Sequence, residues 1–91
     1  MRIRWTVPAA DDLASIKNYL QQHYSHFAEP TVRTIYQRIR SFRTAPKRSR
    51  AGHRSGTREL ALMPLPYVVV YPVRPDAVEI LHIYDGAQDW Q

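Results

Sequence analysis

The chain has 91 residues, no cysteine, a formal net charge of +5 and a sequence pI near 10.0. A chain this short buries only about 60–65% of its unfolded surface, so we expect one domain over residues 1–91. Without cysteine, disulfides, thiolate metal sites and cysteine nucleophiles are excluded. No apolar run reaches the ~18 residues of a membrane span and no signal-peptide core is present, so we expect a cytoplasmic protein with no membrane partner. The excess of positive charge favours an acidic or polyanionic partner.

The first 24 residues predict a strand and then a helix. Residues 2–7 alternate polar and apolar side chains, which is typical of a strand with one buried face. Pro8 suits the first turn of a helix, where Asp11 and Asp12 would lie near the positive end of the helix dipole. Apolar residues at positions 9, 13, 16 and 20 then form one stripe of a helix that continues to about residue 24.

A second helix is predicted over residues 29–44, after a short connection at residues 25–30. Pro30 fits the first turn of a new helix because its missing N–H is unpaired there. Pro46 ends the helix, since the residue before a proline is pushed out of helical geometry. The inward stripe would be Val32, Ile35, Ile39 and Phe42, with Arg33, Arg40 and Arg43 facing outward.

The second half of the chain predicts a loop and three strands. Residues 47–56 have two glycines and no periodicity, as a loop does. Strands are expected over 57–62, 67–73 and 77–84, with a bulge or an early strand end at Pro72, which has no N–H for the ladder. The predicted fold is α+β with the order β-α-α-β-β-β: a helical hairpin packed on one face of a small, mostly antiparallel sheet. The other face is expected to be uncovered and rimmed by basic side chains.

Basic residues are concentrated between Glu29 and Glu59, where nine Arg or Lys and no carboxylate occur. Such a run is a solvated face or the binding surface for an acidic partner. The residues assigned to a nucleic-acid or partner-binding surface are Arg33, Arg40, Arg43, Lys47, Arg48, Arg50 and Arg54, together with Trp90 from the polar tail.

Histidines and tyrosines are weaker candidates. The four histidines, at positions 23, 26, 53 and 82, lack the close spacing of a zinc site, so neither a metal nor a cofactor is predicted. His53 in the loop and His82 in the last strand could each move a proton near neutral pH. A surface histidine and a partly buried core histidine are the commoner interpretations. His23 and His26 are expected to be exposed at the hairpin turn, and Tyr67 and Tyr71 to lie in the core.

Several short motifs follow one another in a characteristic order: Ala-x-x-Asp-Leu-x-x-Ile at residues 9–16, Gly-Thr-Arg-Glu-Leu at 56–60, Pro-Tyr-Val-Val-Val-Tyr at 66–71, and the segments 78–81 and 86–90. Together they resemble the RelE/ParE superfamily of toxins from type II toxin–antitoxin modules, nearly end to end. The resemblance implies the fold above. It also implies an antitoxin partner whose acidic, partly disordered C-terminal segment wraps the toxin.

Members of this superfamily share a fold but differ in target, so the fold does not decide the function. ParE-like members bind DNA gyrase, whereas RelE-like members are ribosome-dependent endonucleases that cut mRNA in the A site. The leading hypothesis is a ParE-like toxin of the plasmid-stabilisation type, which inhibits growth by binding gyrase and is not an enzyme. The alternative is a RelE-like mRNA endonuclease. A third hypothesis is a degenerate toxin that serves only as an antitoxin partner or corepressor.

The endonuclease alternative needs a cation for the phosphate and groups that move protons. Arg58 matches an arginine that contacts the scissile phosphate in RelE-like toxins, although it could instead pair with Glu59 or contact the antitoxin. Asp85 stands where many family members have a histidine, so the resemblance implies that Asp85, or Tyr84 before it, would have to take that residue's catalytic role. A carboxylate with an ordinary pKa near ~4 is a poor proton donor at neutral pH and repels phosphate. This departure is the main argument against nuclease activity.

Overall fold

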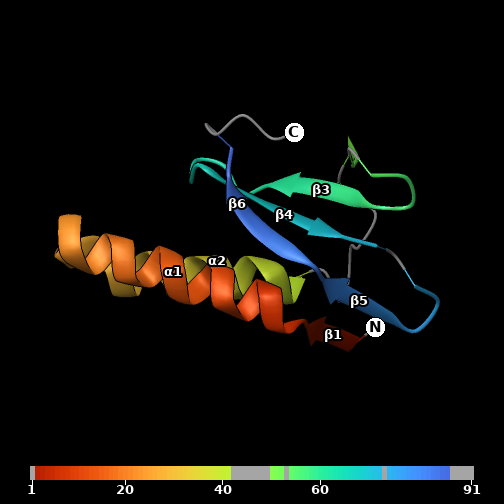
Figure 1. Cartoon of the computed structure of the whole chain (residues 1–91), viewed down its shortest axis with the longest axis horizontal. Coiled ribbons are helices and arrows are strands. Elements are labelled where there is room, and N and C mark those ends of the chain that lie inside the picture. Colours follow the sequence, from red (N-terminus) through yellow and green to blue (C-terminus); the bar gives the residue numbers. More distant parts are fainter. Residues whose placement is uncertain (1, 42–49, 53, 73, 87–91) are drawn as a thin grey trace.

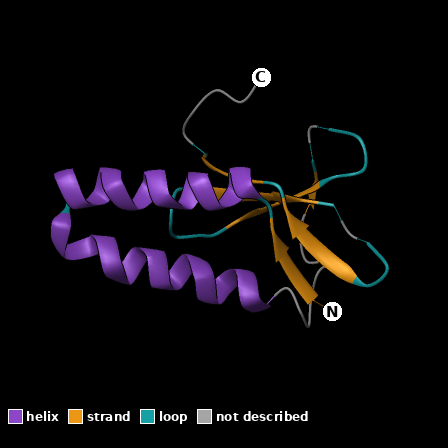
Figure 2. Ribbon diagram, turned by 60° about the horizontal axis from the view of Figure 1, so that its bottom comes forward, coloured by secondary structure: helices purple, strands orange, loops and turns teal. Residues whose placement is uncertain are grey.

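The computed structural model describes residues 2–41, 50–52, 54–72 and 74–86. In chain order the elements are β1 (Arg2–Trp5), α1 (Val7–His23), α2 (Ser25–Arg40), β2 (Arg50–Ala51), β3 (Arg58–Ala61), β4 (Tyr67–Tyr71), β5 (Ala77–Ile80) and β6 (His82–Asp85). The two helices lie side by side and antiparallel, and the strands form a second layer against them (Figures 1 and 2). The predicted α+β class, with a helical hairpin on a small sheet, is confirmed.

Helix α1 begins at a residue that also joins it to the strands. Thr6 is its N-cap, and the Thr6 hydroxyl oxygen accepts a hydrogen bond from the Ala9 N–H at 3.2 Å. The same hydroxyl donates to the carbonyl oxygen of Ile80 at 2.7 Å. Pro8 lies in the first turn as predicted, but no acidic residue does. The expected interaction of Asp11 and Asp12 with the helix dipole is therefore wrong, because the dipole acts mainly within the first turn.

The connection between the helices is a single residue, Tyr24, with φ −147° and ψ 61°. Helix α2 thus begins at Ser25, four residues before the predicted start, and Pro30 lies inside the helix. Proline inside a helix loses one backbone hydrogen bond, here to the carbonyl of His26. Both residues are exposed, so water can replace that bond. The helix ends at Arg40 with Ser41 as its C-cap, and residues 42–44 of the predicted helix lie outside the described residues.

The strands form two sheets, a four-stranded one in the order β2-β3-β4-β6 and a two-stranded one in which β1 pairs with β5. The larger sheet is antiparallel throughout, with Leu60, Val69 and Ile83 in register. The smaller one is parallel, with Ile3 opposite Val78. The predicted strand 77–84 is divided at Leu81, so that its two halves join different sheets.

Two further strand predictions have different outcomes. The strand before Pro72 ends at Tyr71, which confirms the expected early end. The segment predicted to be a loop contains the short strand β2, which pairs with β3 so that Arg50 is opposite Glu59. Two residues are too few for periodicity to be recognised in a sequence.

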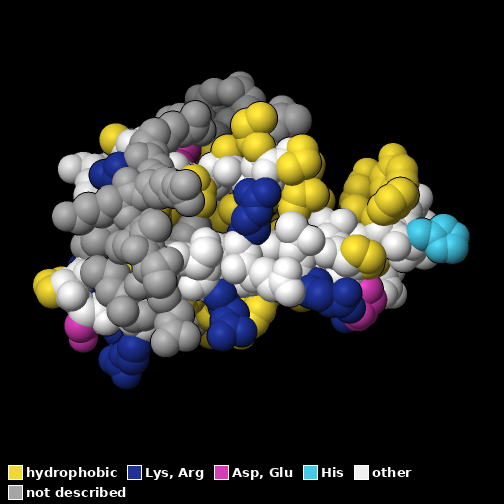
Figure 3. Space-filling view, turned by 180° about the vertical axis from the view of Figure 1, so that it is seen from behind, with side chains coloured by type: hydrophobic (Ala, Val, Ile, Leu, Met, Phe, Trp, Pro, Cys, Tyr) yellow, Lys and Arg dark blue, Asp and Glu magenta, His cyan; other side chains and the backbone are white. Residues whose placement is uncertain are grey.

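Every residue of β4 is buried, so both faces of the central strand are covered. On the helix side, Val69 and Tyr71 pack in the core with Ile35 and Ile39 of α2. On the other side, Val68 and Val70 are only 5% and 6% exposed. The predicted bare face is therefore wrong at the centre of the sheet. Figure 3 shows the described Lys and Arg side chains at several separate places on the reverse of the molecule, not around one exposed area.

Within the described residues, neither helix has the length and apolar composition that crossing a bilayer requires.

Candidate functional site

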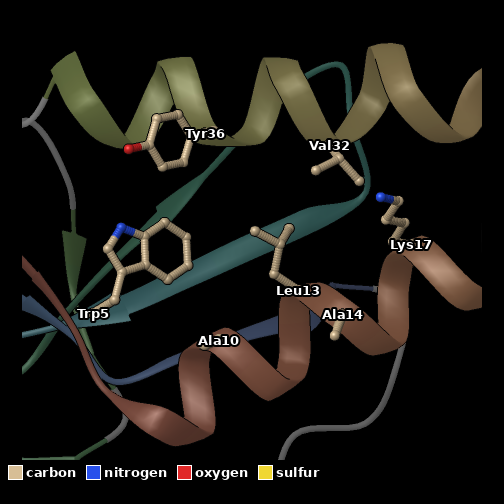
Figure 4. Close-up of a pocket in the computed structure, with 7 residues that line it drawn as sticks. All are labelled: Trp5, Ala10, Leu13, Ala14, Lys17, Val32 and Tyr36. Atoms are coloured by element: carbon tan, nitrogen blue, oxygen red, sulfur yellow. The ribbon is translucent and has the colours of Figure 1, made fainter.

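An apolar groove lies between the two helices, next to the end of β1. Its volume is about 330 Å³, and Figure 4 shows its side chains converging from both helices, with the sheet behind them. It is lined by Trp5, Ala10, Leu13, Ala14, Lys17, Val32 and Tyr36. The lining contains one charged side chain, so an occupant would bury mainly apolar surface.

The groove follows from the sequence of α1. Ala10 and Ala14 are one helical turn apart, and their methyl groups leave a hollow where larger side chains would fill the space. At one end the rings of Trp5 and Tyr36 stack, with centroids 6.1 Å apart and planes 14° apart. Tyr36 is 49% exposed, so this aromatic wall is accessible. Aromatic side chains of this kind are enriched where proteins bind other proteins.

Two cations and one carboxylate lie near the other end of the groove. Glu29 forms ion pairs with Lys17, whose Nζ lies 3.9 Å from Oε1, and with Arg33, whose Nη2 lies 3.7 Å from Oε2. All three side chains are at least 45% exposed, so these ion pairs contribute little to stability. The group has a net charge of +1, and a carboxylate on a partner can pair with either cation.

The structure distributes the predicted partner-binding residues over separate elements. Arg33 and Arg40 are exposed on α2, Arg54 is exposed in the turn before β3, and Arg50 belongs to β2. Arg43, Lys47, Arg48 and Trp90 lie outside the described residues, as does His53. Arg38 donates from Nη2 to the Met63 carbonyl at 2.7 Å and so joins α2 to the β3–β4 turn.

The three residues proposed for catalysis are not brought together. Residues directly opposite each other on neighbouring strands share a face, and Arg58 is opposite Tyr71 while Asp85 is opposite Tyr67. Arg58 and Asp85 therefore share a face but are separated by four residues along β4, or about 13 Å. Tyr84 is opposite Val68 on the other face, and its hydroxyl donates to Glu59 Oε1 at 3.0 Å. One phosphate cannot contact all three in this arrangement.

A second site, which the sequence did not reveal, lies on the opposite flank of α1. Asp12 Oδ2 accepts from the Ile83 backbone N–H at 2.9 Å and lies 3.0 Å from His82 Nδ1. Asp12 thus caps the free edge of β6. Its side chain and that of His82 are 31% and 46% exposed, so His82 is partly buried, as the strand pattern predicted, and contacts Asp12. The Ala-x-x-Asp-Leu motif singles out Asp12, but nothing in its spacing indicates a partner seventy residues later.

A cleft of about 470 Å³, lined by both polar and apolar side chains, adjoins this contact. Residues from α1, β4 and β6 line it: Asp12, Ser15, Ile16, Tyr19, Tyr67, Ile83, Tyr84 and Asp85. Burial raises the pKa of Tyr67 above its ordinary value, and the negative charge of Asp85 and then Tyr19 raise it further. The Tyr67 phenol is therefore neutral at physiological pH.

The remaining candidates have simpler surroundings. His23 and His26 are exposed at the hairpin turn as predicted, and the His23 ring lies 4.5 Å from that of Tyr19. Tyr67 and Tyr71 are buried, which confirms them as core residues. In the part of the chain that the structure describes, no three His, Asp or Glu side chains are placed to hold a metal ion.

The fold and its helical hairpin define a small α+β toxin domain of the RelE/ParE superfamily. The family model described as "ParE toxin of type II toxin-antitoxin system, parDE" matches residues 3–90. The chain belongs to this family, and it is a ParE-type toxin of a type II toxin–antitoxin system. Membership implies an antitoxin partner.

Two similar proteins agree with this assignment. The chain is 34% identical over 89 residues to "Putative toxin Y4kP" of Sinorhizobium fredii (strain NBRC 101917 / NGR234), covering 98% of this chain and 92% of that protein. The structure is also similar to a solved chain of the "Chromosomal ParDE TA system from P. aeruginosa", with a TM-score of 0.84. That match covers 93% of this chain and 95% of the other at 23% sequence identity, and it shows the shared fold.

Proposed function

We propose that this ParE-type toxin inhibits growth by binding DNA gyrase, and that its antitoxin neutralises it by placing an apolar, acidic segment in the groove between α1 and α2. The groove is the observation that carries this proposal. It offers an apolar surface with accessible aromatic rings at one end and cations at the other. That combination suits a protein segment with both apolar and acidic side chains.

The choice of gyrase over mRNA rests on the arrangement of the sheet. RNA cleavage requires a base, an acid and a cation around one phosphate. Among the described residues, Arg58, Tyr84 and Asp85 lie on different faces or far apart on one face. A toxin that acts by binding needs no such convergence. The proposal places the protein in the cytoplasm, where gyrase acts.

Positive charge on the toxin contributes to the proposed binding of the antitoxin. The chain carries +5 overall, and Lys17 and Arg33 share a single carboxylate at the end of the groove. An acidic partner segment can pair with these cations while its apolar side chains lie against Leu13 and Val32. Electrostatic attraction then accelerates association, and apolar burial slows dissociation.

Two purified assays run side by side test the target. The first follows supercoiling of relaxed plasmid by gyrase, and the second follows cleavage of mRNA on programmed ribosomes. The proposal predicts loss of supercoiling with intact message, and restored supercoiling when the coexpressed antitoxin is added. Cleaved message with normal supercoiling would instead support the endonuclease alternative. A chain that affects neither assay, yet binds antitoxin, would support the degenerate toxin.

A groove-filling variant tests the antitoxin part separately. In Ala14→Trp an indole occupies the hollow beside Leu13, so the antitoxin should bind at least about tenfold more weakly, a change of about 1.4 kcal/mol. Gln22→Trp adds the same ring at an exposed position of α1 outside the groove and serves as the control. Isothermal titration with purified antitoxin measures both. Equal affinities for the two variants would remove the groove from the proposal and leave the gyrase claim standing.

A further inference from the structure

The end of the helical hairpin farthest from the sheet exposes a group of aromatic side chains. Tyr19, Tyr24 and Phe27 are 54%, 55% and 63% exposed, and His23 and His26 of the same segment are exposed as well. The hairpin extends past the described strands at this end, so the sheet does not cover its outermost turn (Figures 1 and 2). Figure 3 shows hydrophobic and histidine side chains together there. We call these five residues the hairpin tip.

Three rings of the hairpin tip lie close together where α1 ends. The ring centroids of Tyr19 and His23 are 4.5 Å apart, and each lies 6.5 Å from the centroid of Tyr24. Phe27 follows in the first turn of α2, where its N–H donates to the Tyr24 carbonyl at 2.8 Å. Large apolar side chains that are exposed together mark a site of interaction, whereas single ones are common on any surface. The hairpin tip is therefore a candidate interface.

The hairpin tip is also free of formal charge. Residues 18–28 contain no Lys, Arg, Asp or Glu, although 23% of the chain is charged, and histidine counts as neutral at pH 7. The next charged side chains along the two helices are Lys17 and Glu29, which form an ion pair at 3.9 Å. An uncharged aromatic centre beside a rim with both signs of charge is the usual composition of a protein–protein interface. A nucleic acid would find no cation at the centre of this surface.

We infer that the hairpin tip binds the hairpin tip of a second copy of the chain, forming a two-fold dimer. In a two-fold interface the same surface occurs on both sides and must complement itself. A surface with charge of one sign would repel its own copy, whereas uncharged aromatic rings pack on one another in offset or edge-to-face arrangements. At the rim, Lys17 of one copy can pair with Glu29 of the other. Charge complementarity thus favours a second copy as the partner.

The size of the hairpin tip limits the strength of such a dimer. An aromatic side chain buries about 150–250 Å² in full, and slightly more than half of each of these three is exposed, so contact buries on the order of 300 Å² of aromatic surface per copy. Interfaces at this low end of the range are weak and reversible. The groove that we propose for the antitoxin is lined by other residues. The inference is therefore independent of the proposed gyrase and antitoxin binding.

Sedimentation equilibrium of the purified chain, from about 10 µM to about 1 mM, tests the inference. The weight-average mass should rise from that of one chain towards that of two as the concentration increases. Dilution of the ¹⁵N-labelled chain, followed by nuclear magnetic resonance, locates the contact. The amides of Tyr19, Tyr24 and Phe27 should shift with concentration, whereas those of Ala14 and Tyr36 in the groove should not.

Two matched double variants separate the hairpin tip from general apolar association. Replacing Tyr24 and Phe27 by serine should weaken dimerisation at least about tenfold, because it removes two of the rings from the centre of the contact. Replacing Val7 and Met63 by serine removes two apolar side chains that are 73% and 71% exposed elsewhere, and should leave dimerisation unchanged. Circular dichroism confirms that each variant is folded.

Three results would overturn the inference. The first is a chain that stays monomeric up to about 1 mM, and the second is equal dimerisation of the two double variants. The third is a set of concentration-dependent shifts confined to the groove, which would place the second copy there. If the monomeric chain instead lost gyrase or antitoxin binding when Tyr24 and Phe27 were replaced, the hairpin tip would belong to that partner.

Discussion

Replacing Asp12 by alanine should destabilise the domain far more than replacing its neighbour Asp11. The Asp12 carboxylate accepts the Ile83 N–H at 2.9 Å, and Ile83 is only 4% exposed. Leaving a buried donor without an acceptor costs about 1–3 kcal/mol. The second contact, to His82, is partly exposed and adds less than about 1 kcal/mol. The free energy of unfolding should therefore fall by about 2 kcal/mol, which lowers Tm by about 10 °C in a domain of this size.

Urea denaturation followed by circular dichroism measures this change, and thermal unfolding checks it. Asp12→Asn keeps an amide oxygen that can accept from Ile83, so it should lose about half as much stability. Asp11 is exposed, and its replacement by alanine should change the free energy of unfolding by less than about 0.5 kcal/mol. Equal stability of the Asp12→Ala and Asp11→Ala variants would refute the claim that this carboxylate holds the edge of β6.

Two other changes test the cap of α1 and the buried tyrosine. Thr6→Ala removes both the N-cap and the bond to Ile80 and should cost about 1–2 kcal/mol of unfolding free energy, whereas Thr6→Ser should retain most of it. Urea titrations of the two variants measure the difference, and equal losses would contradict the role of the hydroxyl. Because the pKa of Tyr67 is raised in the folded state, the unfolded chain loses this proton first and stability falls as pH rises above about 10. In Tyr67→Phe that fall should be shallower, and an identical pH profile would show that Tyr67 titrates normally.

The helical hairpin could be predicted from the sequence because its evidence is local. Apolar residues at helical spacing identified both helices, and Pro8 lies in the first turn of α1. The turn was misplaced because Pro30 was interpreted as the start of α2. Pro30 and the carbonyl of His26 are both exposed, so water can replace the hydrogen bond that the proline removes and the helix can begin before it.

The arrangement of the strands could be predicted only in part from local sequence patterns. The alternation of residues 2–7 identified a strand but did not show that β1 would pair in parallel with β5. The sequence of β4 does indicate that the second face is covered, since Val68, Val69 and Val70 form an apolar run without alternation. Such runs are typical of strands that are buried on both faces. This run is the sequence feature that argues against a bare face at the centre of the sheet.

Neither the groove nor the cleft could be predicted from the sequence, because each is formed by residues that meet only in the three-dimensional structure. The groove depends on Trp5 meeting Tyr36 and on two alanines facing a second helix. The cleft depends on Asp12 meeting the edge of β6. Both contacts join residues far apart in the sequence, and no periodicity or motif encodes such pairs. The basic run, by contrast, was obvious in the sequence, but the structure shows its described members at separate places.

The most direct test of the central claim is to measure binding of the purified chain to purified DNA gyrase, with and without the antitoxin. Analytical ultracentrifugation with a fluorescently labelled chain reports the complex, and a supercoiling assay at the same concentrations reports its effect. The account predicts a gyrase complex that forms as supercoiling is lost, and that disappears when the antitoxin occupies the chain. A chain that halts growth but neither sediments with gyrase nor alters supercoiling would contradict it.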